Sequence, residues 1–231
     1  MKTFLAKLDN FWYHYKWHTI FIVFFLSGFL ICAVQCAQKE DPDAAILYSG
    51  PTVMSAEQKE ALGALFAQRL SEDTNGDGAL IVSLTDVVLL SDAQIEEKKA
   101  EAEAQGEALY YDASQRTVAF EQVRSWLIGG EMMLAILDPF VYEKFSDTNL
   151  FVPLADIFET LPDAAYDAYS VKLNELDFVR YHTELADAFD GAVLCLVKPT
   201  AMASLSGNAA EAWYETHVAL FRRIVEFTIV S

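Results

Sequence analysis

The sequence predicts an α/β protein: a single N-terminal transmembrane helix followed by one α/β domain with a largely parallel sheet. Three observations support this prediction. Residues 19–34 form an uncharged apolar run, and apolar strand-like runs alternate with helical stretches between residues 45 and 138. The 231 residues are 53% hydrophobic and 22% charged, a composition typical of a chain that folds around a core. Strands that alternate with helices form β-α-β units, and such units build parallel sheets.

The apolar run, extended to residues 17–37, has the length of a membrane-spanning helix. At about 1.5 Å per residue it measures roughly 31 Å, the thickness of the hydrocarbon core of a bilayer. An aromatic cluster marks its first end, as at a membrane interface: Phe11, Trp12, Tyr13, Tyr15 and Trp17. Three lysines lie within residues 1–16, and three acidic residues lie within residues 40–43. Because basic residues favour the cytoplasmic side, we expect residues 1–16 in the cytoplasm and the domain outside, in a single-pass protein of the cell membrane.

A cleaved or lipidated signal sequence is the alternative to an uncleaved anchor. Lipoprotein processing needs a small residue before the modified cysteine. Ile31 precedes Cys32 and Gln35 precedes Cys36, so neither position fits this requirement. The sequence therefore favours the anchor, with the lipid bilayer as the partner of residues 17–37.

Residues 38–44 read as a polar linker, and residues 45–231 as one extracytoplasmic domain. Beyond residue 37 lie 33 of the 34 acidic and 13 of the 16 basic residues, which gives this part a formal net charge of −20. Such an acidic balance disfavours anionic partners and excludes nucleic acid binding through phosphates. Three cysteines are too few for a disulfide framework, and Cys195 lies in an apolar run typical of a buried strand.

The first elements of the domain follow from local signals. Residues 45–49 are a strand candidate, stopped by Gly50 and Pro51. Ser55 and Gln58 form a capping box that begins a helix. Apolar residues at helical spacing define the buried face of that helix: Leu62, Leu65, Phe66 and Leu70.

Later elements alternate in the same way. A strand is expected over residues 79–85, with residue 90 as its furthest end, and Ser91 begins a strongly polar, solvated helix. A second helix over residues 114–128 ends at two glycines, and residues 132–137 form an apolar strand.

The part of the chain beyond residue 140 has weaker signals. We expect short helical pieces there, a strand within residues 170–178 that pairs with residues 192–198, and a final helix from Asn208. His217 lies on this helix beside apolar neighbours, which predicts a partly buried histidine rather than a metal ligand.

The strand ends supply the candidate ligand-binding residues. In a parallel sheet, ligands bind outside the carboxyl ends of the strands. Four predicted strands end at residues 49–51, 85–86, 138–139 and 198–200, and the candidates there are Tyr48, Ser49, Asp138 and Thr200. Tyr48 is suited to stacking on a sugar or another ring, and Asp138 is either a ligand contact or a helix cap. Strand-terminating turns remain the alternative at each end.

A possible calcium loop precedes the second strand. Asp73, Asn75 and Asp77 occupy positions 1, 3 and 5 of such a loop, and Gly78 occupies position 6. Position 12 is Leu84, where a calcium loop has a bidentate carboxylate. An Asp/Asn/Gly turn without metal is therefore the alternative. Calcium is the one cofactor for which the sequence offers ligands.

No catalytic motif is present, so the sequence does not predict an enzyme. It contains no GxSxG, P-loop, GxGxxG, HExxH or CxxC pattern. The carboxylates are so numerous that an acid–base pair cannot be selected by spacing.

Two segments carry a resemblance to a known family. Residues 127–138 read LIGGEMMLAILD and residues 150–158 read LFVPLADIF. The stretch between residues 47 and 158 resembles bacterial extracytoplasmic solute-binding proteins, and the matching positions are Gly130, Glu131, Asp138, Pro153, Leu154 and Asp156. The chain is also similar to uncharacterised membrane-anchored proteins of Gram-positive bacteria.

The resemblance implies a periplasmic-binding-like domain of about one lobe. It further implies binding of a small solute or peptide without catalysis. The alternative is a module that binds another protein of the cell envelope, an interpretation favoured by the short domain and by the long acidic helix after Ser91.

Overall fold

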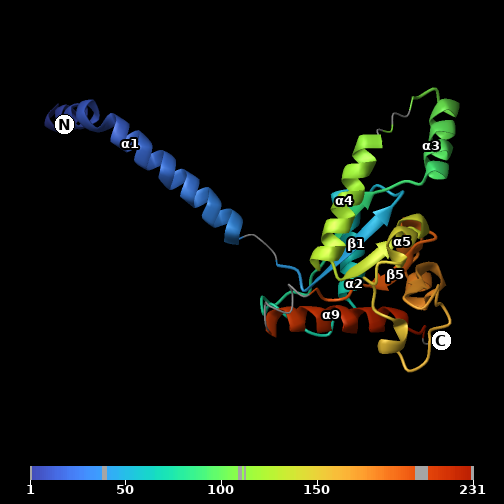
Figure 1. Cartoon of the computed structure of the whole chain (residues 1–231). Coiled ribbons are helices and arrows are strands. Elements are labelled where there is room, and N and C mark those ends of the chain that lie inside the picture. Colours follow the sequence, from blue (N-terminus) through green and yellow to red (C-terminus); the bar gives the residue numbers. More distant parts are fainter. Residues whose placement is uncertain (1, 38–40, 109–110, 112, 201–207, 230–231) are drawn as a thin grey trace. The chain divides into compact units, whose positions relative to one another are not determined.

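The computed structural model describes residues 2–37, 41–108, 111, 113–200 and 208–229. The chain divides into two compact units, Met1–Asp41 and Pro42–Ser231, and each is described by itself. Figure 1 shows the elements of both units.

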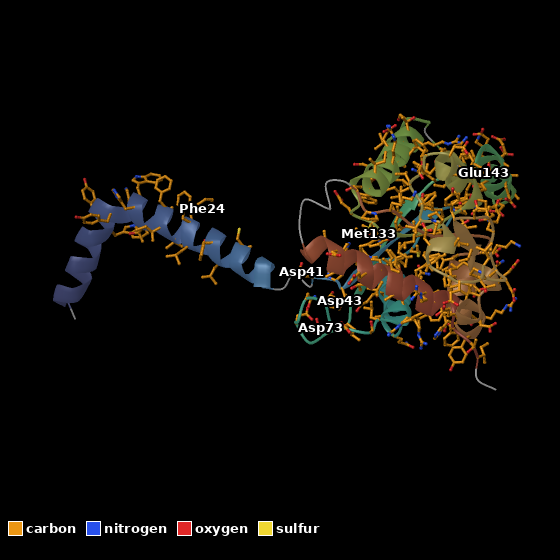
Figure 2. The ribbon with its side chains drawn as sticks, turned by 60° about the horizontal axis from the view of Figure 1, so that its bottom comes forward. Phe24, Asp41, Asp43, Asp73, Met133 and Glu143 are labelled. Carbon is orange, nitrogen blue, oxygen red and sulfur yellow. The ribbon has the colours of Figure 1, made fainter. Side chains whose placement is uncertain are left out.

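The first unit is a single long helix, α1 (Lys2–Ala37). Within it, Tyr15–Cys32 is long and apolar enough to cross a membrane. Its apolar side chains are exposed, for example Phe24 at 70%, which projects from the helix in Figure 2. The finding confirms one exposed N-terminal apolar helix, which fits a single anchor or a signal sequence.

A five-stranded mixed sheet organises the second unit. Its strands are β1 (Ala44–Gly50), β2 (Val82–Val88), β3 (Leu134–Leu137), β4 (Ser170–Lys172) and β5 (Val193–Leu196). Their order is β2-β1-β3-β5-β4. The pairs β2-β1 and β1-β3 are parallel, whereas β3-β5 and β5-β4 are antiparallel. The α/β class is confirmed, but the expectation of a largely parallel sheet holds only for β2, β1 and β3.

Helices cover both faces of the sheet, so the domain has three layers (Figure 1). On one face lie α2 (Ala56–Ala67) and α9 (Asn208–Val225), packed against Ile46 and Tyr48 of β1. On the other lie α4 (Ala113–Gly129) and α5 (Pro139–Ser146), packed against Leu47. This alternation along β1 is the period of two that a strand buried on both faces requires.

Local sequence signals locate several helix ends. Ser55 caps α2 and Ser91 caps α3 (Asp92–Ala104), each through a complete capping box. As expected for a solvated helix, Ile95 is the buried residue of α3. Gly130, with φ of 71°, follows α4 in the left-handed conformation that glycine adopts readily.

The segment between α5 and β5 consists of short elements. They are η1 (Leu154–Asp156), β4, η2 (Leu173–Glu175), α6 (Asp177–Tyr181) and α7 (Thr183–Ala188). The predicted pairing of residues 170–178 with 192–198 is confirmed for Ser170–Lys172. Beyond Lys172 the chain turns into η2 and α6, which bury Leu173 and Phe178 in the core.

The amino end of β1 corrects the predicted linker of residues 38–44. Strand β1 begins at Ala44, and Asp43 is fully buried. Its carboxylate accepts hydrogen bonds from the Thr74 backbone N–H at 2.7 Å and from the Ile81 N–H at 3.0 Å. Figure 2 shows Asp43 beside the turn that contains Asp73. Asp43 therefore belongs to the fold, where it satisfies the backbone of the segment before β2.

Candidate functional site

Three of the four predicted strand ends meet at one edge of the sheet. Because β1, β2 and β3 are parallel, Ser49, Asp86 and Asp138 lie at neighbouring carboxyl ends. The Asp138 N–H donates to the Ser49 carbonyl oxygen at 2.8 Å, which closes β3 onto β1. The structure thus brings Tyr48, Ser49 and Asp138 together, as the sequence predicts. We call this region the strand edge.

Thr200 does not lie at the strand edge, and here the expectation of a shared edge is wrong. Strand β5 is antiparallel to β3, so its carboxyl end points toward the amino end of β3. A Cβ atom at Gly130 would lie 3.2 Å from the Thr200 methyl carbon, which places Thr200 just before β3. Strand direction depends on the long connection between β3 and β5, and local sequence does not encode it.

The polar side chains of the strand edge are hydrogen-bonded within the protein. Asp138 caps α5 by accepting from the Phe140 N–H at 2.8 Å, and its second oxygen accepts from Gln94 Nε2 at 2.9 Å. Ser49 is fully buried and donates its hydroxyl to the Val87 carbonyl oxygen at 3.1 Å. Of the two interpretations of Asp138, the helix cap is the one with a geometric basis.

Tyr48 is a core residue, not an exposed stacking surface. Its ring packs against Phe189 with centroids 5.1 Å apart, and its hydroxyl accepts from the Thr52 N–H at 3.2 Å. The ring folds over Gly50, where a Cβ would lie 2.6 Å from the tyrosine oxygen. Glycine is therefore required at position 50 for this close approach of the ring. Burial of the ring also raises the pKa of the Tyr48 hydroxyl.

The strand edge also contains an ion pair that no sequence motif indicates. Lys59 of α2 lies 2.8 Å from Asp86, whose other carboxylate oxygen accepts from the Met54 N–H at 3.3 Å. No local pattern in the sequence relates Asp86 to a lysine 27 positions earlier. This pair links α2 to β2 and leaves the strand edge internally paired.

The predicted calcium ligands are acceptors for backbone amides of their own turn. Asp73 accepts from the Gly76 and Gly78 N–H groups at 2.6 and 2.7 Å. Asn75 accepts from Asp77 and Asp77 from Ala79, each at 2.8 Å. Across the described residues, no three His, Cys, Asp or Glu side chains are grouped to hold a metal ion. The turn geometry explains these residue types without metal, and calcium binding stays a prediction.

A hollow of about 300 Å³ lies between α3 and α4, and a larger set of hollows lies around the end of α9. Three adjoining hollows of about 370, 550 and 460 Å³ share Glu226, which lines all of them. Phe158 and Thr160 link the first hollow to the third, and Phe227 and Thr228 link the first to the second. We call the three together the α9 groove; it lies near the end marked C in Figure 1.

Arginine is concentrated in the α9 groove. Four of the six arginines of the chain line it: Arg69, Arg180, Arg222 and Arg223. The Arg69 guanidinium carbon lies 4.9 Å from the Phe227 ring centroid and 5.8 Å from that of Phe178. Arg223 donates to the Arg69 carbonyl oxygen at 3.3 Å, and Arg222 to that of Ile157 at 2.8 Å. The adjacent Arg222 and Arg223 are the feature of the sequence from which this groove could have been predicted.

Comparisons with known proteins do not assign the chain to a family. No family model matches the sequence, and neither a curated protein nor a solved structure is significantly similar to it.

Proposed function

We propose that this chain is a membrane-anchored binding protein whose extracytoplasmic domain captures a small solute or peptide at the α9 groove without catalysis. In this proposal α1 is an uncleaved single-pass anchor with the N-terminus in the cytoplasm. The lysines before the apolar segment and the acidic residues after it support this orientation. The resemblance of residues 127–138 and 150–158 to solute-binding proteins, taken from the sequence alone, would imply the same binding role.

The observation that carries the proposal is the convergence of three hollows on one arginine-lined groove. Binding sites are concave and combine apolar walls with a few polar groups that orient the ligand. The α9 groove has this character, with Phe158 and Phe227 beside the arginines. At the strand edge, by contrast, Asp86 and Asp138 already have partners within the protein.

A thermal-shift screen of the full-length chain in detergent tests the proposal. Sugars, amino acids, short peptides and calcium are the probes. A ligand at ~100 times its dissociation constant adds about 2.7 kcal/mol, which raises the melting temperature by several degrees. For a hit, hydrogen exchange then locates the site. Protection of residues 222–229 supports the proposal, whereas protection confined to the strand edge, or no hit at all, contradicts it. A calcium-only shift would point to Asp73, Asn75 and Asp77 instead.

Cysteine labelling tests the orientation of the anchor. We expect Glu143→Cys, on an exposed position of α5, to react with a membrane-impermeant maleimide in intact cells. Lys7→Cys serves as the matched position on the other side and is expected to react only after permeabilisation. The reverse pattern would contradict the proposed topology.

A second candidate function, a binding module for another envelope protein, is favoured by exposed apolar residues that adjoin groove-lining residues in the sequence. Leu161 is 54% exposed, Tyr181 61% and Ile229 48%. Aromatic residues and arginine are enriched at protein interfaces. A photo-crosslinker at position 181 is expected to trap one defined partner in native membranes. Val118, exposed on α4, is the control position, and equal trapping from both positions would reject this function.

A further inference from the structure

The arginines of the chain fall into two groups by their partners. Arg116, Arg124 and Arg180 each pair with a carboxylate, of Asp92, Glu121 and Asp177 respectively. Among the described residues, Arg69, Arg222 and Arg223 have no carboxylate within 4.0 Å, and all three line the α9 groove. Arginines without an ion pair are unexpected here, because 33 acidic residues lie beyond residue 37. Three of them gather in one groove, two from the last turn of α9 and one from the end of α2.

Arg69 and Arg223 lie in the same hollow and are held in fixed relation. Arg69 stacks on Phe227 and Phe178, and its Nε is buried without a hydrogen-bond partner. Arg223 is hydrogen-bonded to the Arg69 backbone. Gln68 and Thr228 add further polar groups, and Glu226 is the acidic residue that lines this hollow. The hollow therefore has one excess positive charge and two pre-positioned cations.

We infer that this hollow binds an oxyanion group, a carboxylate or phosphate, of a small ligand, with Arg69 and Arg223 as the binding residues. The inference rests on the proposed function and names its ligand class. Planar guanidinium groups match carboxylate and phosphate oxygens with paired hydrogen bonds. The stacking of Arg69 on Phe227 and Phe178 holds its guanidinium group in place, which reduces the entropy lost when a ligand binds. The exposed Tyr181 ring, whose centroid lies 5.9 Å from that of Phe227, and Ile229, which follows Thr228, suit an apolar group attached to the oxyanion.

The acidic surface restricts this ligand to a small one. The formal charge of −20 beyond residue 37 repels polyanions, because several of their charges face acidic surface at once. Screening limits charge effects to about 8 Å at physiological ionic strength. A compact ligand with one oxyanion thus interacts chiefly with the two arginines.

Ligand titrations of the full chain in detergent at 0.15 M salt test the inference. The probes are benzoate, phenyl phosphate and inorganic phosphate, with benzamide as the neutral isostere of benzoate. We expect benzoate or phenyl phosphate to bind at least tenfold more tightly than benzamide. Comparison of the affinities for benzoate and phenyl phosphate shows whether the hollow prefers a carboxylate or a phosphate. Equal affinity for benzoate, phenyl phosphate and benzamide overturns the inference.

Variants assign the effect to the two arginines. Because a hydrogen bond to a charged group is strong, Arg223→Gln is expected to weaken binding of the preferred probe about tenfold. Arg69→Lys keeps the charge but loses the planar fork, and it is expected to weaken binding as well. Arg124→Gln, the same charge change on α4, is the matched control and is expected to leave binding unchanged. Binding that survives both groove variants, or that falls equally in the control, contradicts the inference.

Hydrogen exchange separates failure of this inference from failure of the proposed function. A neutral ligand could protect residues 222–229 and bind equally well to the arginine variants. That result would keep the groove as a binding site but reject the oxyanion as its ligand. Absence of protection by every probe would reject both.

Discussion

The acidic side chains next to the strands and the arginines of the α9 groove differ in the partners that the protein offers them. Asp43, just before β1, and Asp138, just after β3, are almost completely buried, and each accepts hydrogen bonds from nearby backbone or side-chain donors. In the α9 groove, Arg69 and Arg223 have no carboxylate partner within the described residues. The two aspartates therefore stabilise the fold. The side chains available to a ligand are Arg69 and Arg223, which belong to no sequence motif.

Asp43→Ala is expected to produce the largest effect. It removes the fully buried acceptor of the Thr74 and Ile81 N–H groups, at an expected cost of about 3 kcal/mol in the free energy of unfolding. Urea titration measures this loss. Asp73→Ala, in the exposed turn, is the control and is expected to cost about 1 kcal/mol. Equal costs would show that burial of the acceptor does not matter.

The pH dependence of Asp43 follows from the same hydrogen bonds. Burial raises the pKa of its carboxyl, but the hydrogen bonds from Ile81 and Thr74 outweigh burial and hold the pKa below 3.8. The stabilisation is therefore present above pH 3.8 and is lost as the pH falls through the folded-state pKa. The difference in stability between wild type and Asp43→Ala is expected to shrink below pH 3.8.

Asp138→Ala is expected to cost about 1–2 kcal/mol in stability, because it removes the cap of α5 and the bond to Gln94. If the strand edge is purely structural, ligand affinity at the α9 groove does not change. Thermal unfolding and ligand titration of the same variant check both statements. A loss of affinity without a loss of stability would indicate that the ligand binds at the strand edge and not at the α9 groove.

His217 gives a smaller, pH-dependent effect. It is fully buried and joins α9 to β1: Ala45 N–H donates to Nε2 at 3.0 Å, and Nδ1 lies 2.7 Å from the Trp213 carbonyl oxygen. Nε2 also lies 3.2 Å from the Ala45 carbonyl oxygen. A neutral ring with its proton on Nδ1 accepts from the Ala45 N–H and donates to the Trp213 carbonyl oxygen. Burial lowers the pKa of His217, so the native state resists protonation while the unfolded chain accepts a proton below about pH 6.5.

Stability is accordingly expected to be complete above about pH 6.5 and to decrease as the pH falls below it. His217→Gln removes the titrating group and is expected to flatten this part of the profile, at an overall cost of about 1 kcal/mol. Chemical denaturation between pH 5 and pH 8 measures the difference. An unchanged slope in the variant would assign the dependence to another group.

Arg223→Gln is expected to have the smallest effect on stability, within about 0.5 kcal/mol, because its side chain is exposed. The same variant is expected to lose ligand affinity. Arg223→Gln should thus lose affinity but keep its stability, whereas Asp138→Ala should lose stability but keep its affinity. Thermal unfolding and ligand titration of both variants under one condition compare them directly. A large loss of stability in Arg223→Gln would make the groove a structural feature.

Much of the fold was predictable because its signals are local. The capping boxes at Ser55 and Ser91 and the glycine stop at Gly130 involve residues at most a few positions apart. The candidate site was predictable in part: Ser49 and Asp138 meet because parallel strands place their carboxyl ends together. Thr200 was assigned to the wrong edge because the direction of β5 is decided by its partner β3.

The apolar N-terminal helix, the α/β class, and the helix caps and turns follow from the sequence, because each depends on the order of neighbouring residues. The antiparallel direction of β5 and the covering of Tyr48 by Phe189 come from contacts between distant parts of the chain. Such contacts also gather Arg69 and Arg223 in one hollow. The two arginines are 154 positions apart, and only the packing of α9 beside the end of α2 makes them neighbours.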